Sequence, residues 1–155
     1  DTEETFGESI VWGQLLDAQN RIYAYGAPEV NAPGRDTGGV YLINAGGQIL
    51  GDPLSNGNNR TGQGRRLSVY SRSDRAQDAL VVGGASGGQV NIWTFENNGN
   101  NISIEEDVPV SVAEATERFG WGIHVSEEGR DGTARLFVSD PEQGERGAVY
   151  IFSIR

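Results

Sequence analysis

One segment of this chain occurs three times, and the repetition limits the folds that the chain can adopt. Each copy opens at a corner, which is Phe6-Gly7, Gln63-Gly64 or Phe119-Gly120. A second corner follows in each copy, sixteen residues after Ile10, Leu67 or Ile123: Gly26-Ala27-Pro28, Gly83-Gly84-Ala85 or Ser139-Asp140-Pro141. Equivalent positions are therefore 57 and 56 residues apart. A period of this length is typical of repeat architectures, in which each unit buries its apolar face against its neighbours.

Short runs of β-type composition recur in the same order in every copy. We expect strands at 9–14, 21–26 and 39–43, then at 67–70, 79–82 and 89–95, and finally at 122–126, 134–138 and 148–154. Candidate fourth strands are 47–50 and 102–110, and the third copy has none. Residues 112–118 have helical composition, but their place before a Phe-Gly corner indicates a loop or a single turn.

These units predict an all-β fold built from blades of four antiparallel strands, as in a β-propeller. The repeats span about 6–62, 63–118 and 119–155 within a single domain, 1–155, so there are about three blades and the last is incomplete. A ring normally closes with four to eight blades, so we expect either further copies of this chain or parent sequence missing from this piece to cover the open ends. An unpaired sheet edge is also a template for strand addition by another chain.

Composition excludes several classes of function. The 22 acidic residues face twelve arginines and no lysine, which gives a net charge of −10 and argues against nucleic-acid binding. No apolar stretch approaches the roughly 20 residues of a membrane helix, so no membrane span is expected. Cysteine is absent, which excludes disulfides and thiolate chemistry. Methionine is absent as well, so we expect a processed form or an excised piece.

The corners and the glycine-led strands that follow them resemble the FG-GAP repeats of integrin α-subunit propellers and their microbial relatives. The resemblance rests on three elements in fixed order and covers nearly the whole chain: the Phe-Gly corners, the Gly-Ala-Pro-like corners, and Gly39-Val40-Tyr41 with Gly147-Ala148-Val149-Tyr150. It implies a propeller used for adhesion, ligand binding or assembly, located outside the cell or on its surface.

Many such repeats carry a calcium loop of the form Asp-x-Asp/Asn-x-Asp-Gly-x-x-Asp before the second corner. The third copy comes closest, with Glu127 and Asp131, but Arg135 stands where the last carboxylate would be. We predict a degenerate loop in which Arg135 pairs with Asp131 or Glu127 in place of the cation. No metal and no other cofactor is therefore expected.

The aromatic residues are predicted to pack between blades, and two tryptophans are also candidates for ligand binding: Trp121 and Trp93. His124 is the only histidine, and its place beside Ile123 favours a structural role. No nucleophile and base can be assembled from the side chains present, so we do not expect an enzyme. Asn59 and Asn101 stand in acceptor patterns for N-glycosylation, which favour a secretory route.

The sequence therefore predicts a non-enzymatic extracellular adhesion or assembly module that binds a protein partner or further copies of itself through open blade edges. The alternative is a carbohydrate-binding module, in which Asn-rich and Gly-rich loops recognise a glycan together with Trp121 or Trp93.

Overall fold

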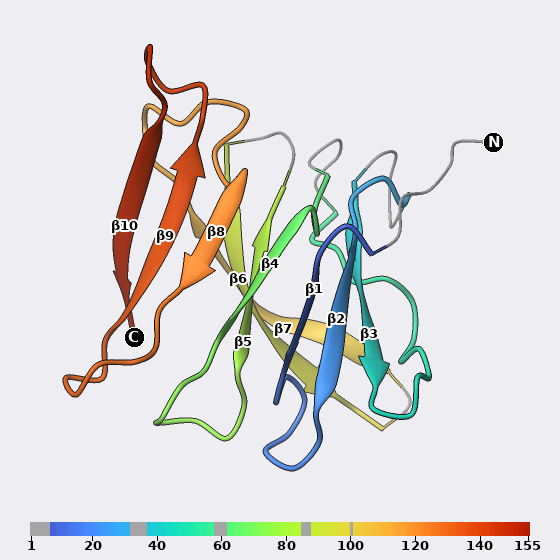
Figure 1. The fold of residues 1–155 in the computed structure, drawn as a ribbon. Coiled ribbons are helices and arrows are strands. Elements are labelled where there is room, and N and C mark those ends of the chain that lie inside the picture. Colours follow the sequence, from blue (N-terminus) through green and yellow to red (C-terminus); the bar gives the residue numbers. More distant parts are fainter. Residues whose placement is uncertain (1–6, 32–36, 58–61, 85–87, 100) are drawn as a thin grey trace.

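The computed structural model describes residues 7–31, 37–57, 62–84, 88–99 and 101–155. Within these ranges the chain forms strands and turns and no helix, which confirms the prediction of an all-β fold. The strands make three antiparallel sheets that lie side by side in chain order, as Figure 1 shows.

In every sheet the spatial order of the strands follows their order in the sequence, so hairpin connections join neighbouring strands. The N-terminal sheet contains β1 (Ile10–Gly13), β2 (Ile22–Ala27) and β3 (Gly39–Asn44). The central sheet contains β4 (Arg66–Tyr70), β5 (Ala79–Gly83), β6 (Val90–Asn97) and β7 (Ile102–Val110). The C-terminal sheet contains β8 (Gly122–Val125), β9 (Ala134–Asp140) and β10 (Ala148–Ile154).

One predicted fourth strand forms and the other is broken. The stretch 102–110 becomes β7, whereas 47–50 makes one isolated bridge to β3, at Ile43 with Ile49, and a second bridge joins Val40 to Leu54 beyond it. Between these bridges Gly51 adopts a φ of 93°, and Pro53 has no amide hydrogen to donate. Pairing along β3 is therefore interrupted, and the N-terminal sheet has three continuous strands.

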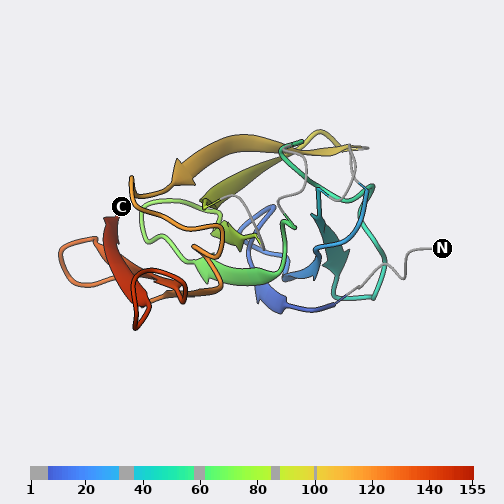
Figure 2. The ribbon, with the colours of Figure 1, turned by 90° about the horizontal axis from the view of Figure 1, so that it is seen from above.

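The central sheet is buried on both faces because its strands alternate between two cores. Leu80 and Val82 of β5 belong to the core shared with the N-terminal sheet, whereas Ala79 and Val81 belong to the core shared with the C-terminal sheet. All five residues of β5 are buried. In Figure 2, seen from above, the three sheets follow one another from the N-terminal to the C-terminal side of the molecule.

Because of a β-bulge in the central sheet, β7 contributes side chains to both cores. The register between β6 and β7 shifts between Thr94 and Phe95. As a result, Ile102 and Ile104 pack toward the N-terminal sheet, whereas Val110 packs toward the C-terminal sheet.

The first corner of each repeat is tied to the second by the same hydrogen bond. The amide groups of Gly7, Gly64 and Gly120 donate to the carbonyl oxygens of Gly26, Gly83 and Ser139, at 2.9, 3.2 and 3.0 Å. Gly64 and Gly120 both adopt a φ of 90°, which a side chain would disfavour. Phe6 lies outside the described residues.

The loop before the third repeat is anchored by a buried carboxylate. Asp140 is fully buried and accepts hydrogen bonds from the Thr116 amide, at 2.8 Å, and from the Thr116 hydroxyl. Residues 112–118 form turns, as predicted. This anchor holds the loop against the end of the C-terminal sheet.

Candidate interaction surfaces

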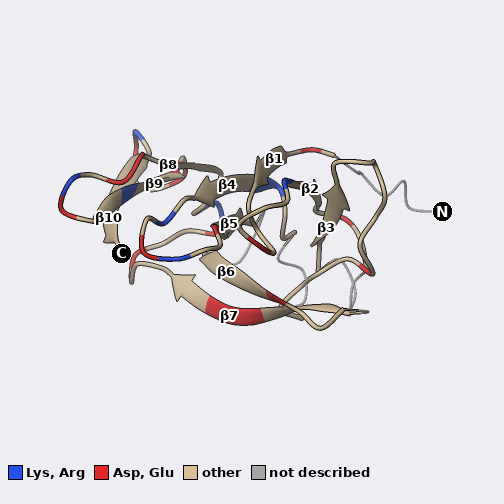
Figure 3. Cartoon of the chain, turned by 90° about the horizontal axis from the view of Figure 1, so that it is seen from below, with Lys and Arg blue, Asp and Glu red and all other residues tan. Residues whose placement is uncertain are grey.

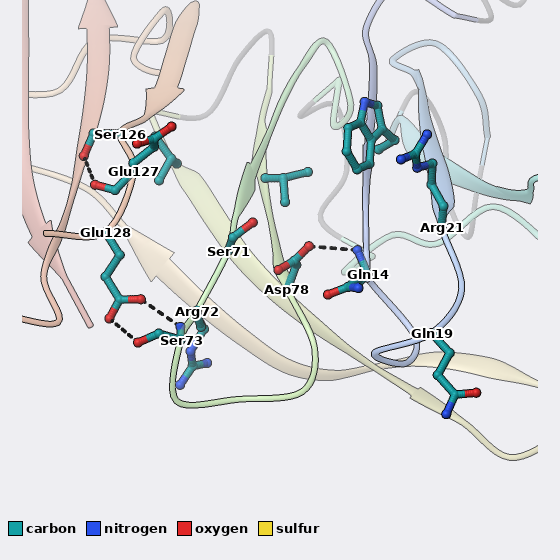
Figure 4. Close-up of a pocket in the computed structure, with 13 residues that line it drawn as sticks. Gln14, Gln19, Arg21, Ser71, Arg72, Ser73, Asp78, Ser126, Glu127 and Glu128 are labelled. Carbon is teal, nitrogen blue, oxygen red and sulfur yellow. Dashed lines mark hydrogen bonds between the residues drawn. The ribbon is translucent and has the colours of Figure 1, made fainter. Parts of the chain in front are cut away.

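A polar groove of about 650 Å³ runs along the first strands of the three sheets, and Figure 4 shows its lining. Gln14, Ser71 and Glu127, which are equivalent in the three repeats, all line it. Asp78 accepts a hydrogen bond from the Gln14 amide at 2.8 Å, and Glu128 accepts one from the Ser73 amide at 2.7 Å. These bonds tie adjacent sheets together across the floor of the groove.

The predicted cation substitute in the third repeat does not form. The Arg135 guanidinium donates to the Ser153 hydroxyl, not to Asp131 or Glu127, because Arg135 and Ser153 are cross-strand partners on β9 and β10. Asp131 instead accepts a hydrogen bond from the Thr133 amide at 3.1 Å, and Gly132 adopts a φ of 71°. The hydrogen bond from the Thr133 amide to the Asp131 side chain therefore stabilises this turn.

Side chains suited to a metal ion do not gather in the described part of the chain. No group of three or more His, Asp or Glu residues with suitable placement occurs there. Glu127 is exposed at the groove and Asp131 is exposed in the turn.

The tryptophans occupy three different environments. Trp93 is fully buried, and its indole N–H donates to Asp107 at 2.9 Å, which corrects its prediction as a ligand-binding residue. Trp121 is half-buried, with the guanidinium carbons of Arg118 and Arg65 at 4.8 and 5.7 Å from its ring centre. Trp12 is 55% exposed and lines the groove, with Arg21 at 4.0 Å over its ring.

Sequence reasoning assigned Trp12 to packing between blades and missed its exposure. The signal that could have found it is position: Trp12 lies on the first sheet, and that sheet has no preceding sheet in the described chain to cover it.

The outer edges of the central and C-terminal sheets differ in chemistry. The β7 edge carries Glu105, Glu106 and Asp107, the red band in Figure 3, and then Pro109, which has no amide hydrogen. Charges and proline discourage another strand from pairing. The β10 edge carries no charged residue, and in the described chain β9 is its sole partner strand.

A partly apolar pocket of about 330 Å³ lies beside the end of β10, between the central and C-terminal sheets. We call it the β10 slot. Ile92, Val108 and Ile154 form part of its lining, and Val108 is 49% exposed. Arg72 and Thr94 also line it. Thr94 Oγ1 is buried without a hydrogen-bond partner, whereas Arg72 Nε makes no hydrogen bond but lies 3.5 Å from Asp74 Oδ1 in an ion pair. A buried hydroxyl is costly to leave unpaired, so the slot favours an occupant with polar atoms.

Each end sheet has one face on which no other sheet of the described chain packs. We call the open face of the N-terminal sheet the front face; cross-strand registers place these residues on it: Ile10, Trp12, Tyr23, Tyr25, Tyr41 and Ile43. We call the open face of the C-terminal sheet the back face; its residues are His124, Arg135, Phe137, Ser139, Val149, Ile151 and Ser153. Ile10, Val149 and Ile151 are 55, 65 and 62% exposed. Contiguous apolar exposure of this kind marks interaction sites.

His124 lies on the back face and is exposed, with its ring centre 6.2 Å from that of Phe137. The neighbouring residue, Ile123, is the one that packs on the central sheet, and the structural role of His124 stays a prediction. Asn101 is exposed in the turn before β7, and its use for glycosylation stays a prediction. Asn59 lies outside the described residues.

Three titrating groups have pKa values shifted by their surroundings. Burial raises the pKa of Tyr70, which packs in the core shared by the central and C-terminal sheets. Desolvation also raises the pKa of Tyr150, which packs on the same core. A hydrogen bond from the Asn20 side chain lowers the pKa of Asp17, in the turn before β2.

Searches with the sequence add no relative to this description. No family model matches the chain, and no curated protein matches it. None of the described segments is a helix long and apolar enough to cross a membrane.

Proposed function

We propose that this chain is a non-enzymatic adhesion or assembly module, a segment of an extracellular β-propeller that binds a protein partner or further copies of itself. The sheets serve as blades, and the chain uses its open edges and faces for binding. Support for the propeller comes from the repeat period and from the packing order: β4 lies against β1 and β2, and β8 lies against β4 and β5.

The observation that carries the proposal is the unpaired β10 edge beside the β10 slot. An extended segment of a partner protein adds to β10 as a fourth strand, so that its backbone pairs with the free amide and carbonyl groups of that edge. Alternate side chains of the segment then enter the slot and cover Val108 and Ile92.

Charge in the slot selects the partner further. Arg72, Arg75 and Arg155 line it, against the single acidic residue Glu106. An acidic side chain of the added strand pairs with these guanidinium groups. The expected partner segment alternates apolar and polar residues and carries at least one carboxylate.

A library of ten-residue peptides displayed on phage, selected against the immobilised chain, tests this proposal. We expect recovered peptides with the alternating acidic pattern, and protection of β10 amides from hydrogen exchange when they bind. Val108→Glu, which places a charge in the slot, is expected to lower affinity at least tenfold, whereas Val149→Glu on the back face leaves it unchanged. Failure to recover any peptide, or equal loss in both variants, would contradict strand addition at β10.

A carbohydrate-binding role is the second candidate, and the exposure of Trp12 favours it. Trp12, Gln14 and Gln19 all line the polar groove, and an aromatic ring together with amide side chains is suited to sugar rings and hydroxyl groups. A glycan array decides: signals lost in Trp12→Ala and kept in Trp121→Ala support the groove. An array without signal would exclude this role for the glycans present.

A further inference from the structure

The three sheets use equivalent positions in the same register, so their faces can be compared residue by residue. Ile10 pairs with Tyr25, Leu67 with Val82, and Ile123 with Val138. These pairs occupy the same place in the first two strands of each sheet, and they point to the same side of it.

On this side a preceding sheet covers the second and third sheets, and no sheet of the described chain covers the first. Leu67 and Val82 belong to the core against the N-terminal sheet, and Val138 belongs to the core against the central sheet. The equivalent residues of the N-terminal sheet, Ile10 and Tyr25, lie on the front face, and Ile10 is 55% exposed. The front face is therefore the counterpart of two faces that are buried against a preceding sheet.

The opposite side gives the complementary result. Ala24 pairs with Leu42, and both are buried in the core shared with the central sheet. Val81 pairs with Ile92 and packs in the same way on the C-terminal sheet. The equivalent pair of the C-terminal sheet, Phe137 with Ile151, lies on the open back face, where no following sheet covers it in the described chain.

We propose that the back face of one copy of this chain packs on the front face of a second copy, and so repeats the contact that joins the sheets within one chain. This inference rests on the proposed assembly role and names its partner and its surfaces. The contact is head-to-tail, so it leaves one front face and one back face free and extends to a ring or an open polymer.

Charge supports this choice of surfaces. The chain carries a net charge of −10, yet neither face has a carboxylate among its defined residues. The guanidinium groups at these faces are those of Arg135 on the back face and Arg21, which lies 4.0 Å over the Trp12 ring on the front face. Depletion of negative charge in this way is consistent with a protein interface on a strongly acidic chain.

The repeat equivalence also places individual residues in the interface. Gly13 lies against Val69 between the first two sheets. Two repeats further along, Ser126 is equivalent to Gly13, and Trp12 of the second copy is equivalent to Val69. The proposed pairing therefore places Ser126 of one copy beside Trp12 of the next. Likewise, Gly26 and Gly83 lie close to the carbonyl oxygens of Gly64 and Gly120, so Ser139 comes to lie beside Gly7 of the second copy.

At Ser139 and Gly7, we expect the contact between two copies to be looser than the equivalent contacts between sheets inside one chain. A Cβ atom added at Gly26 would lie 1.7 Å from the Gly64 oxygen, and one added at Gly83 would lie 2.7 Å from the Gly120 oxygen. Ser139 already carries a side chain, which keeps Gly7 of the second copy farther away. Association is therefore expected to be reversible, and Ser139→Gly should tighten it several-fold.

Light scattering after size exclusion tests the pairing with two blocked variants. Trp12→Glu disables the front face and Ile151→Glu disables the back face; both residues are more than half exposed, so the fold should tolerate the changes. We expect wild type to form species larger than 16.6 kDa and each variant alone to run as the 16.6 kDa chain. An equimolar mixture should give a one-to-one dimer, because each variant keeps the face that the other lacks.

Several outcomes would overturn the head-to-tail pairing. These are a monomeric wild type at about 100 μM, multimers that persist in both variants, or a mixture that stays monomeric while wild type associates. Multimers abolished by Val108→Glu instead would refute it but leave strand addition at β10 intact. Since the chain has no cysteine, Ser126→Cys mixed with Trp12→Cys under oxidation gives a second measurement: a disulfide in the mixture and in neither variant alone supports the register.

Discussion

At the scale of single residues, glycine at the corners sets how closely the sheets approach each other. Gly26 has no space for a side chain, since the Gly64 backbone occupies the position of its Cβ atom. Its φ is not positive, so its role is close approach and not a left-handed conformation. The corner motif in the sequence therefore reports a contact between sheets.

Gly26→Ala is expected to destabilise the fold by about 3 kcal/mol, because backbone must shift to accept the methyl group. Urea denaturation followed by tryptophan fluorescence measures the change. Gly46→Ala is the control, since its added Cβ would meet the Asn44 side chain at 3.2 Å and no backbone atom. Equal stability of the two variants would show that the corner tolerates a side chain.

Tyr70 gives the fold a specific response to alkaline pH. Its pKa is raised by burial, so folding favours the neutral hydroxyl, and stability falls as pH rises above the ordinary value of about 10. Tyr70→Phe should therefore lose less stability than wild type as the pH rises above about 10. Denaturant midpoints across this range measure it, and parallel curves for the two proteins would refute the assignment.

At the scale of strands, position within a sheet decides how strongly each strand is held. β5 and β9 are paired on both sides, and all residues of β5 are buried. β10 is paired on one side, and its residues alternate between half-buried and exposed. β10 is therefore less protected than β9, its partner strand.

Hydrogen exchange should rank the strands in this order. Amides of β5 are expected to exchange slowest, at or near the rate of global unfolding, and the outward amides of β10 fastest among the strands of the chain at low concentration. Mass spectrometry of peptides at micromolar concentration measures it. If β10 were as protected as β5 in a 16.6 kDa species, the open edge would already be covered.

At the scale of the whole molecule, net charge opposes the apolar attraction of the end faces. Copies that each carry −10 repel at low ionic strength, and salt screens this repulsion over about 10 Å at 0.1 M. The balance makes association depend on solution conditions.

Raising NaCl from about 0.02 to 0.5 M should therefore shift the chain toward larger species, whereas removal of calcium with a chelator should not change its mass. Sedimentation velocity reports both effects. Dissociation by salt would indicate that ion pairs hold the copies together, and dissociation by a chelator would indicate that a cation does.

The sequence alone determined the repeat, the all-β fold and almost every strand, because alternation and glycine corners are local properties. It missed that pairing with β3 is interrupted just after the stretch 47–50, at Gly51 and Pro53. It misplaced the partner of Arg135, since that partner depends on which strand lies alongside β9.

What the tertiary structure decided is exposure. Trp12 and Trp93 are both aromatic residues in strands, yet one is exposed and the other is buried. The difference arises because Trp93 belongs to a sheet with neighbours on both sides, whereas Trp12 lies on the open face of an end sheet. Local sequence sets which residues share a face, and the stacking order of the sheets decides whether that face meets protein or solvent.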